Sequence, residues 1–319
     1  MISYERFRKE VMNRILSYLP ESYAGWKVRM ETEYKVNQIF DCLTLYPPEQ
    51  RKLIAVPRFN MQEYYNMFLK GASADFILRM IASRIENAPS PEAVEQSGFD
   101  LLKFQDDVVL QLINRFRNHV FLKSVPYRPF QDLAVICRIL VFDPNGKWAG
   151  AIVNHSLLQA MGITEEELFE RAYKHTPQAL PFRLTDTIEL LPCKGTFREK
   201  CEAGCRELCS KILQHPNHGI LQEPHGKILM LTNDSEQFGA AAMLYPEQLN
   251  AACETLGGSI YILPGSMHEL YIVREEPEKL EFYRQLVAQM NRDSMAETEW
   301  LSNQVYRYHR KTGKVKVAI

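Results

Sequence analysis

The spacing of hydrophobic positions changes along the first part of the chain. Phe7, Val11 and Ile15 are spaced as on one face of a helix, whereas apolar and charged residues alternate from Trp26 onward, as in antiparallel strands. Turns are expected near Asn37 and Pro47. The predicted elements are a helix over 4–19, a meander of three strands over 26–34, 39–45 and 52–59, and helices over 60–70 and 73–87.

Residues 88–98 form the predicted linker, because they are poor in apolar side chains and contain two prolines. The predicted domains are residues 1–98, which include this linker, and residues 99–319. Beyond the linker, the apolar positions of residues 104–122 are spaced for a long helix, which Pro126 stops.

The second domain contains a layout that occurs twice. Leu140–Ile163 and Leu229–Gly257 each contain an apolar stretch, a polar turn, an aromatic residue close to Gly and Ala, a second apolar stretch and a helical segment. Each copy therefore predicts a strand, a turn, a second strand and a helix. Thr164 and Glu167 form a capping-box sequence for one following helix, and Pro246 suits the first turn of the other.

The remaining pattern predicts two strands, over 259–263 and 269–273, then helices over 278–290 and 295–308 and a basic tail. Strands that gather in hairpins between helices are typical of α+β proteins and not of a doubly wound parallel sheet. The sequence therefore predicts an α+β fold. An N-terminal helix and three-stranded meander with helices precede two strand-turn-strand-helix units, with antiparallel sheet and C-terminal helices.

Composition narrows the class of protein. The 319 residues are 46% hydrophobic and 24% charged, with a formal net charge of -1, which argues against a globally basic nucleic-acid binder. No apolar run reaches the ~20 residues of a membrane span, and the charged N-terminus lacks a signal-peptide core, so we expect a cytoplasmic protein without membrane contact. No common cofactor motif is present, so no cofactor is predicted.

Five segments span most of the chain in a recognisable order. They are Arg117-Asn118, PYRPFQDL (Pro126 to Leu133), LTN-x5-GAAAMLYPEQL (Leu231 to Leu249), YILPGSMHEL (Tyr261 to Leu270) and LSNQVYRY (Leu301 to Tyr308). In this order they resemble an uncharacterised family, domain of unknown function number 5688, of gut anaerobes and mobile elements. The resemblance implies an association with mobile elements and supplies no catalytic residues.

A cysteine cluster is the first candidate site. Cys201, Cys205 and Cys209 recur at every fourth residue, and Cys193 precedes them. Four thiols suit zinc, but three ligands on successive turns of one helix span about 12 Å, and one ion with bonds of about 2.3 Å cannot reach all three. Free cysteine also packs as a small hydrophobic residue. We therefore predict core packing, with a metal site or a redox pair as alternatives.

Ser266, His268 and Glu269 combine residue types that serve nucleophilic and acid–base chemistry. Alternation along a strand places His268 and Glu269 on opposite faces, and no orienting acid or oxyanion hole is visible. A turn followed by a strand also explains this segment. A structural role is the favoured interpretation, and a ligand-contacting role for His268 is the alternative.

A second polar group lies before the first repeated unit and contains Arg117, Arg128 and Asp132. A buried Arg–Asp pair is the favoured interpretation, because bidentate pairs often hold such junctions. An anion-binding pocket built from Arg117 and Arg128 is the alternative. A catalytic role for Asp132 or these arginines would require them to converge with His268.

The C-terminal tail combines basic residues with tyrosines that could grip a nucleic-acid backbone and stack on bases. The basic residues are Arg307, Arg310, Lys311, Lys314 and Lys316. Alternation of lysine and valine over 314–317 also suits a short edge strand, where lysine discourages aggregation. The edge strand is the favoured interpretation.

We therefore expect a binding or regulatory module whose partner is another protein, with a non-enzyme favoured over an enzyme. Two alternatives stay open. One is a hydrolase or metal-assisted enzyme that uses His268, with Ser266, Arg117, Arg128 or Asp132 as further candidates. The other is a nucleic-acid-binding protein that uses the tail.

Overall fold

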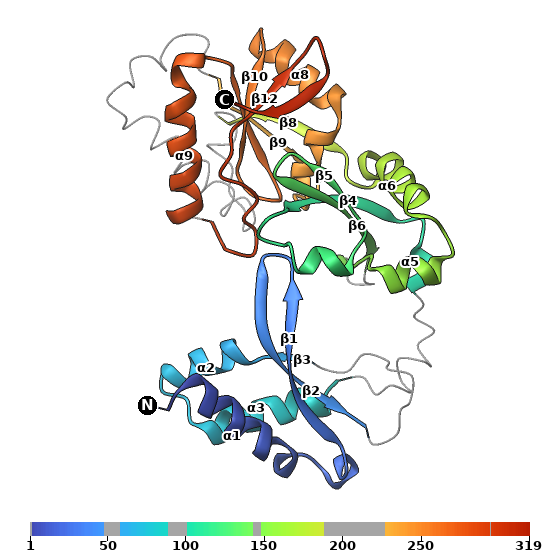
Figure 1. Cartoon of the computed structure of the whole chain (residues 1–319), viewed down its shortest axis with the longest axis vertical. Coiled ribbons are helices and arrows are strands. Elements are labelled where there is room, and N and C mark those ends of the chain that lie inside the picture. Colours follow the sequence, from blue (N-terminus) through green and yellow to red (C-terminus); the bar gives the residue numbers. More distant parts are fainter. Residues whose placement is uncertain (1, 48–57, 89–100, 143–147, 188–226, 294) are drawn as a thin grey trace. The chain divides into compact units, whose positions relative to one another are not determined.

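The computed structural model describes residues 2–47, 58–88, 101–142, 148–187, 227–293 and 295–319. The chain divides into two compact units, Met1–Leu101 and Leu102–Ile319 (Figure 1). Within the described residues, no helix is both long enough and apolar enough to span a bilayer.

The first unit is a small antiparallel sheet with helices. Its elements are α1 (Tyr4–Arg14), β1 (Lys27–Lys35), β2 (Gln38–Tyr46), β3 (Arg58–Asn60), α2 (Met61–Leu69) and α3 (Ala74–Glu86). The strands pair in the order β1-β2-β3, and Asn37, at φ 60°, closes the tight turn between β1 and β2. Phe7 and Val11 of α1 pack with Leu43 of β2 and Ile77 of α3 in one buried core. The sheet thereby covers its apolar residues with helices.

Helix starts in this unit are set by side chains that accept the first free N–H groups. Ser3 accepts from the backbone of Arg6, and Ser73 accepts from Phe76 at 3.1 Å. Asn60 accepts from Gln62 at 3.0 Å, and its amide also donates to Glu63. The helix start predicted at Asn60 is therefore confirmed, because this cap satisfies an otherwise unpaired donor.

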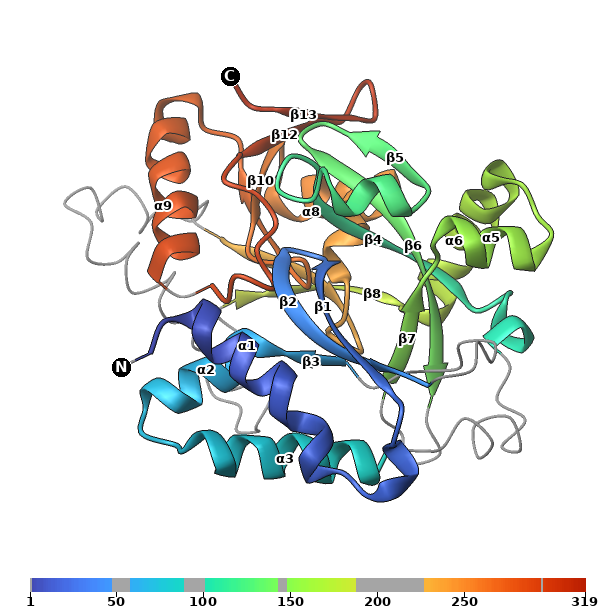
Figure 2. The ribbon, with the colours of Figure 1, turned by 60° about the horizontal axis from the view of Figure 1, so that its bottom comes forward.

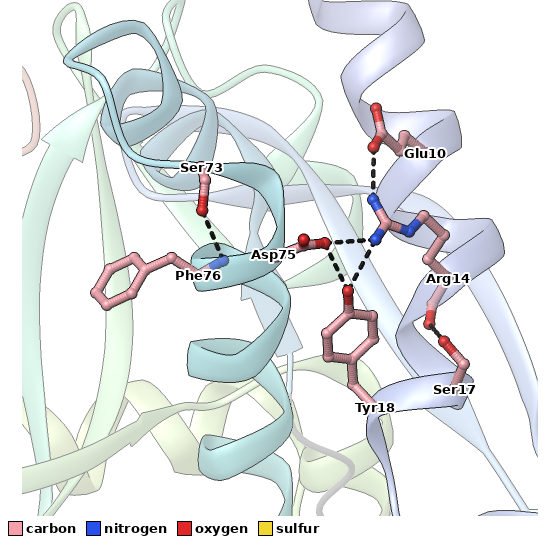
Figure 3. Close-up of polar contacts among 7 residues, drawn as sticks. All are labelled: Glu10, Arg14, Ser17, Tyr18, Ser73, Asp75 and Phe76. Carbon is pink, nitrogen blue, oxygen red and sulfur yellow. Dashed lines mark hydrogen bonds and ion pairs between the residues drawn. The ribbon is translucent and has the colours of Figure 1, made fainter.

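At the surface of the junction between α1 and α3, one arginine joins polar groups of both segments, as Figure 3 shows. Arg14 donates to Glu10 at 2.7 Å, to the Tyr18 hydroxyl at 2.8 Å, and to Asp75 at the start of α3. Tyr18 in turn donates to Asp75 at 2.6 Å. Arg14 therefore contacts a carboxylate of α1, a carboxylate of α3 and the phenol of Tyr18, which lies shortly after α1.

The described residues of the second unit form two antiparallel sheets. In the first, β6 (Leu133–Phe142) pairs with β4 (Val108–Asn114), β5 (Tyr127–Phe130) and β7 (Trp148–Ile152). The second has the order β13-β12-β10-β11-β9-β8. Its strands are β8 (Phe182–Asp186), β9 (Leu229–Asn233), β10 (Ile260–Pro264), β11 (Leu270–Arg274), β12 (Tyr306–His309) and β13 (Lys314–Val317).

Helices in the second unit lie beside these sheets (Figures 1 and 2). They are α5 (His155–Met161), α6 (Glu165–Ala179), α8 (Pro246–Leu256) and α9 (Leu280–Asp293), with a 3-10 helix, η7, at Gly239–Leu244. Tyr283 and Val287 of α9 pack on Tyr261 of β10 and Tyr271 of β11. The face of the sheet that carries these tyrosines is therefore closed by α9.

Three side chains join the first sheet of this unit to the last part of the chain. Asn114 donates to the carbonyl of Leu301 at 3.1 Å, and Gln131 donates to that of Val315 at 3.2 Å. Asp132 accepts from Ser302 and from Tyr306, each at 2.6 Å. The C-terminal strands are thus anchored by residues that precede them by 170 positions or more.

The predicted α+β class with antiparallel sheets is confirmed. The capping box at Thr164 and Glu167 is present with both of its hydrogen bonds, and Pro246 begins α8. The first repeated unit has its predicted hairpin, β6 with β7, followed by α5. Val315 of β13 is buried between exposed lysines at the sheet edge, so the edge-strand interpretation is also confirmed.

Three predicted elements are wrong. The long helix over 104–122 is instead β4, whose seven residues are all buried. A strand buried on both faces is continuously apolar, so its residues do not alternate and can imitate a helical stripe. The helix predicted over 295–308 is also wrong: residues 295–305 form turns and irregular chain, and β12 follows, where buried Tyr306 and Tyr308 flank exposed Arg307.

The third error concerns the second repeated unit. Its second strand is absent, because residues 239–244 form η7, with Gly239 to Met243 buried. The small side chains of Gly and Ala let this segment approach neighbouring backbone closely. The two copies in the sequence therefore share a strand and a helix but not a common fold.

Candidate functional site

His268 lies in the tight turn between β10 and β11, directly after Met267. The Ser266 hydroxyl accepts from the backbone N–H of His268 at 2.9 Å and donates to Glu269 at 2.7 Å. Ser266 is buried, 2% exposed, and both of its bonds close the turn. Its oxygen is therefore engaged in structure and is not presented as a nucleophile.

The turn is held against η7 by close backbone contact. Phe238, with a left-handed φ of 58°, donates its N–H to Nδ1 of His268 at 3.1 Å. A Cβ at Gly239 would lie 2.3 Å from the His268 carbonyl oxygen and 2.5 Å from Oγ1 of Thr232. Thr232 donates to that same carbonyl at 2.8 Å. Only glycine fits at position 239, and it brings two distant segments of the chain together.

This contact fixes the proton on His268. Because Nδ1 accepts from Phe238, the neutral ring carries its hydrogen on Nε2. Burial lowers the pKa of His268; the charge of Arg138 lowers it further, while Glu299 opposes the shift. His268 is therefore a neutral imidazole at pH 7 with one N–H donor on Nε2.

Arg138, in the middle of β6, is the cation next to this histidine. Its Nε donates to Gln111 at 3.1 Å, its Nη1 donates to the carbonyl of Gly150 at 3.2 Å, and its guanidinium lies 4.9 Å from the ring centre of Phe238. Burial lowers the pKa of Arg138 to about 10, so it stays charged at pH 7. Within the described residues, no carboxylate pairs with it.

Arg138 and His268 meet through Phe238, whose ring centre lies 5.7 Å from that of His268. We call these three residues the Arg138–His268 site. Gln111 supports the site from β4, since its amide also donates to the sulfur of Met267 at 3.3 Å. A guanidinium and a neutral imidazole N–H are both hydrogen-bond donors. Together they are suited to a carboxylate or phosphate oxygen.

Glu269 adds an acid with an unusual pKa beside this site. Burial raises its pKa to about 7; the hydrogen bond from Ser266 opposes this, and the charges of Glu299 and Glu236 add to it. The side chain therefore changes charge close to neutral pH.

The other sequence candidates do not join this site. Arg117 pairs with Glu297 at 3.3 Å, and Arg128 lies 4.6 Å from the ring centre of Phe169. Asp132 binds Ser302 and Tyr306 (above), so the predicted Arg–Asp pair is wrong for the part of the chain that the structure describes. Arg117 does line a pocket, but not together with Arg128.

The tyrosine rings of the C-terminal tail are not exposed for stacking on nucleic-acid bases. Tyr306 and Tyr308 are both 0% exposed, so they cannot stack on bases. Arg307 pairs with Glu275 at 2.8 Å, and Arg310 pairs with Glu254 at 2.6 Å. Three lysines of the tail are exposed, namely Lys311, Lys314 and Lys316.

Metal ligands do not gather in the described residues, where no group of three His, Cys, Asp or Glu side chains could hold an ion. The cysteine cluster of Cys193, Cys201, Cys205 and Cys209 lies outside them. Cys42, Cys137 and Cys253 are free and buried, and burial raises the pKa of each thiol.

Sequence reasoning missed Arg138, Gln111 and Phe238. Arg138 is the one charged residue within the apolar run of Leu133–Phe142, and Gln111 is the polar residue inside VVLQLI. A lone polar residue within a buried strand is a signal that a partner or ligand is present. Phe238 gave no such signal, because its left-handed backbone is visible only in the fold.

Comparison with known proteins gives a family but no function. The model of the family of unknown function DUF5688 matches residues 4–310. No curated protein and no solved structure matches the chain. Two segments of the family resemblance, those that contain Gly239 and His268, are the ones that pack together at the Arg138–His268 site. The match covers nearly the whole chain, which therefore belongs to the family of unknown function DUF5688.

Proposed function

We propose that the protein is a binding module whose ligand or partner presents a negatively charged group, a carboxylate or a phosphate, to the Arg138–His268 site. The observation that carries this proposal is the set of partners of Arg138. Among the residues that the structure describes, these partners are a side-chain amide, a backbone carbonyl and an aromatic ring, and none of them carries a formal negative charge.

A largely buried cation without a counter-ion is costly, and proteins normally pair it. Arg138 keeps its charge and its orientation, because Gln111 and Gly150 hold two of its nitrogens. The Nε2 hydrogen of His268 has no acceptor within the described residues. An arriving anion would therefore gain two donors without breaking an existing ion pair.

The proposal favours binding over catalysis. Ser266 is buried, and its hydroxyl is hydrogen-bonded within the turn. Asp132 accepts a hydrogen bond from Tyr306. Among the candidate residues, neither therefore provides an accessible nucleophile paired with a base. The proposed association with mobile elements, which rests on the family resemblance alone, would fit such a regulatory module.

The test is a titration of protein labelled with ¹⁵N at histidine, with inorganic phosphate and citrate as probes. We expect the His268 imidazole signals to move with added probe in the unmodified protein. The movement should vanish in Arg138→Met, which keeps an unbranched apolar stem but removes the charge. It should persist in Lys316→Gln, which removes one positive charge from the exposed edge of β13.

Two results would contradict the proposal. One is that His268 signals do not respond to either probe. The other is that Arg138→Met and Lys316→Gln reduce the response equally, which would indicate general charge attraction rather than a site.

A further inference from the structure

A separate pocket of about 460 Å³ lies where the end of α9 meets the loop that follows it. Its lining residues are Arg117, Ala288, Asn291, Arg292, Met295, Glu297, Trp300 and Asn303. The volume lies within the range of pockets that take small organic ligands. None of the three residues of the Arg138–His268 site lines it, so it is a second site with its own chemistry.

Arg117 is fixed in this pocket by two contacts. Its guanidinium lies 5.2 Å from the ring centre of Trp300, and its Nη2 lies 3.3 Å from a carboxylate oxygen of Glu297. Glu297 is 87% exposed, so this ion pair is a weak one that an incoming anion can replace. The cation–π contact keeps Arg117 in place when Glu297 moves away.

Arg292 supplies a second cation from the last turn of α9. It is exposed and forms no ion pair within the part of the chain that the structure describes. Two arginines on one pocket outnumber its single carboxylate. They can share the oxygens of one phosphate group, which arginine binds in a bidentate manner.

Two asparagines add a donor and an acceptor. The side-chain amide of Asn291 donates two hydrogen bonds, to the carbonyl of Ser302 at 2.9 Å and to Oδ1 of Asn303 at 2.7 Å. Its own Oδ1 therefore remains an acceptor, and the Nδ2 of Asn303 remains a donor without a partner in the described residues. An acceptor and a donor side by side match the polar edge of a heterocyclic ring.

We propose that this pocket binds a nucleoside monophosphate. The phosphate would lie between Arg117 and Arg292, the base would pack against Trp300 and Met295, and its polar edge would meet Asn291 and Asn303. Each part of this ligand has a matching group on the pocket, since indole rings stack on bases and amides read their edges.

The test is isothermal titration calorimetry of the full chain with AMP, GMP, CMP and UMP. Adenosine and inorganic phosphate serve as the two halves of the ligand. We expect at least one nucleotide to bind about tenfold more tightly than either half, because both ends of the pocket then contribute. Arg292→Gln should weaken that nucleotide about tenfold by loss of a charge-assisted hydrogen bond.

Glu297→Gln gives a test of opposite sign. It removes the carboxylate that competes for Arg117, so nucleotide affinity should rise several-fold. Glu281→Gln is the matched control, because Glu281 is an exposed acid at the other end of α9 and pairs with Arg284. This control should leave the affinity unchanged.

The proposal is overturned if no nucleotide binds, or if inorganic phosphate binds as tightly as every nucleotide. It is also overturned if Arg138→Met abolishes nucleotide binding while Arg292→Gln does not, because the ligand would then occupy the Arg138–His268 site. Unchanged nucleotide binding in Arg138→Met supports this pocket, whatever the outcome at the other site.

Discussion

Arg14 and Arg138 differ in the kind of group that holds the guanidinium in place. Arg14, in the first unit, is surrounded by Glu10, Asp75 and the Tyr18 hydroxyl (Figure 3). Arg138, in the second unit, is more deeply buried but is held by an amide, a carbonyl and a ring. The less buried arginine, Arg14, has two acids, and the more deeply buried Arg138 has none among the described residues.

The difference separates structure from function. Arg14 forms ion pairs with Glu10 of α1 and Asp75 of α3. Because both acids already balance its charge, it attracts an external anion only weakly. Arg138 is oriented by groups that, in the described part of the chain, carry no negative charge, and this is why we propose that its charge receives a ligand. A charged side chain that is held in place but has no counter-ion is typical of a binding site and not of a stabilising contact.

The largest expected effect comes from the backbone contact that builds the Arg138–His268 site. Gly239→Ala places a Cβ against the His268 carbonyl and should destabilise the protein by about 3 kcal/mol, measured by urea unfolding. Gly258→Ala is the control, because the nearest atom there lies 3.6 Å away and belongs to a side chain. Equal stability of the two variants would contradict the close packing at Gly239.

Glu269 gives the next effect, and it depends on pH. The pKa of Glu269 in the folded protein, about 7, lies above the ordinary glutamate value of 4.5, so the folded state binds the proton more tightly than the unfolded state. The cost of ionising buried Glu269 is therefore absent below about pH 4.5 and grows until about pH 7. Glu269→Gln should raise the free energy of unfolding by about 2 kcal/mol at pH 8, after allowance for partial exposure.

The control for this prediction is the same pair of proteins at pH 4, where the stabilising effect of Glu269→Gln should disappear. Urea unfolding across this pH range measures it. A difference that stays constant with pH would show that Glu269 does not titrate in this window.

Arg138→Met should change stability little, within about 1 kcal/mol, because relief of the buried charge offsets the loss of a partner for Gln111. Its anion response should nevertheless disappear. Thermal unfolding, with and without phosphate, separates the two quantities. A large loss of stability would mean that Arg138 serves to hold the fold and not to receive a ligand.

Arg14→Met is the reverse case and the smallest expected effect. It should lower the melting temperature slightly, because Asp75 and Glu10 lose their shared cation, and it should leave the phosphate response of His268 unchanged. High salt should reduce the difference from the unmodified protein, since this network is solvent-exposed. A loss that does not change with salt would indicate that the ion pairs of Arg14 contribute little and that its packing contacts cause the effect.

Much of the fold could be predicted from local signals. The alternation in β1 and β2, the capping residues Ser73 and Thr164, and Pro246 at the start of α8 act within a few residues of themselves. The strand β4 could not be identified, because burial on both faces removes the alternation that marks a strand. Burial on both faces is a property of the tertiary structure.

The candidate site was predictable only in part. His268 could be selected by its residue type, and its turn could be expected from Pro264 and Gly265. Its contact with Arg138 depends on Phe238 and Gly239, about 30 residues before it, and on a strand about 130 residues before it. No local pattern encodes such a meeting. The lone arginine of β6 was the signal that could have been followed.

The anchoring of the C-terminal strands has a consequence for synthesis on the ribosome. Asp132, Asn114 and Gln131 meet their partners only at Ser302, Leu301 and Val315. During translation these polar groups have no partner until residues 301–315 are synthesised, and β10 lacks one of its neighbours until β12 emerges. The second unit therefore cannot form these contacts before residues 301–317 are synthesised, and we expect its incomplete sheet edge to be prone to aggregation until then.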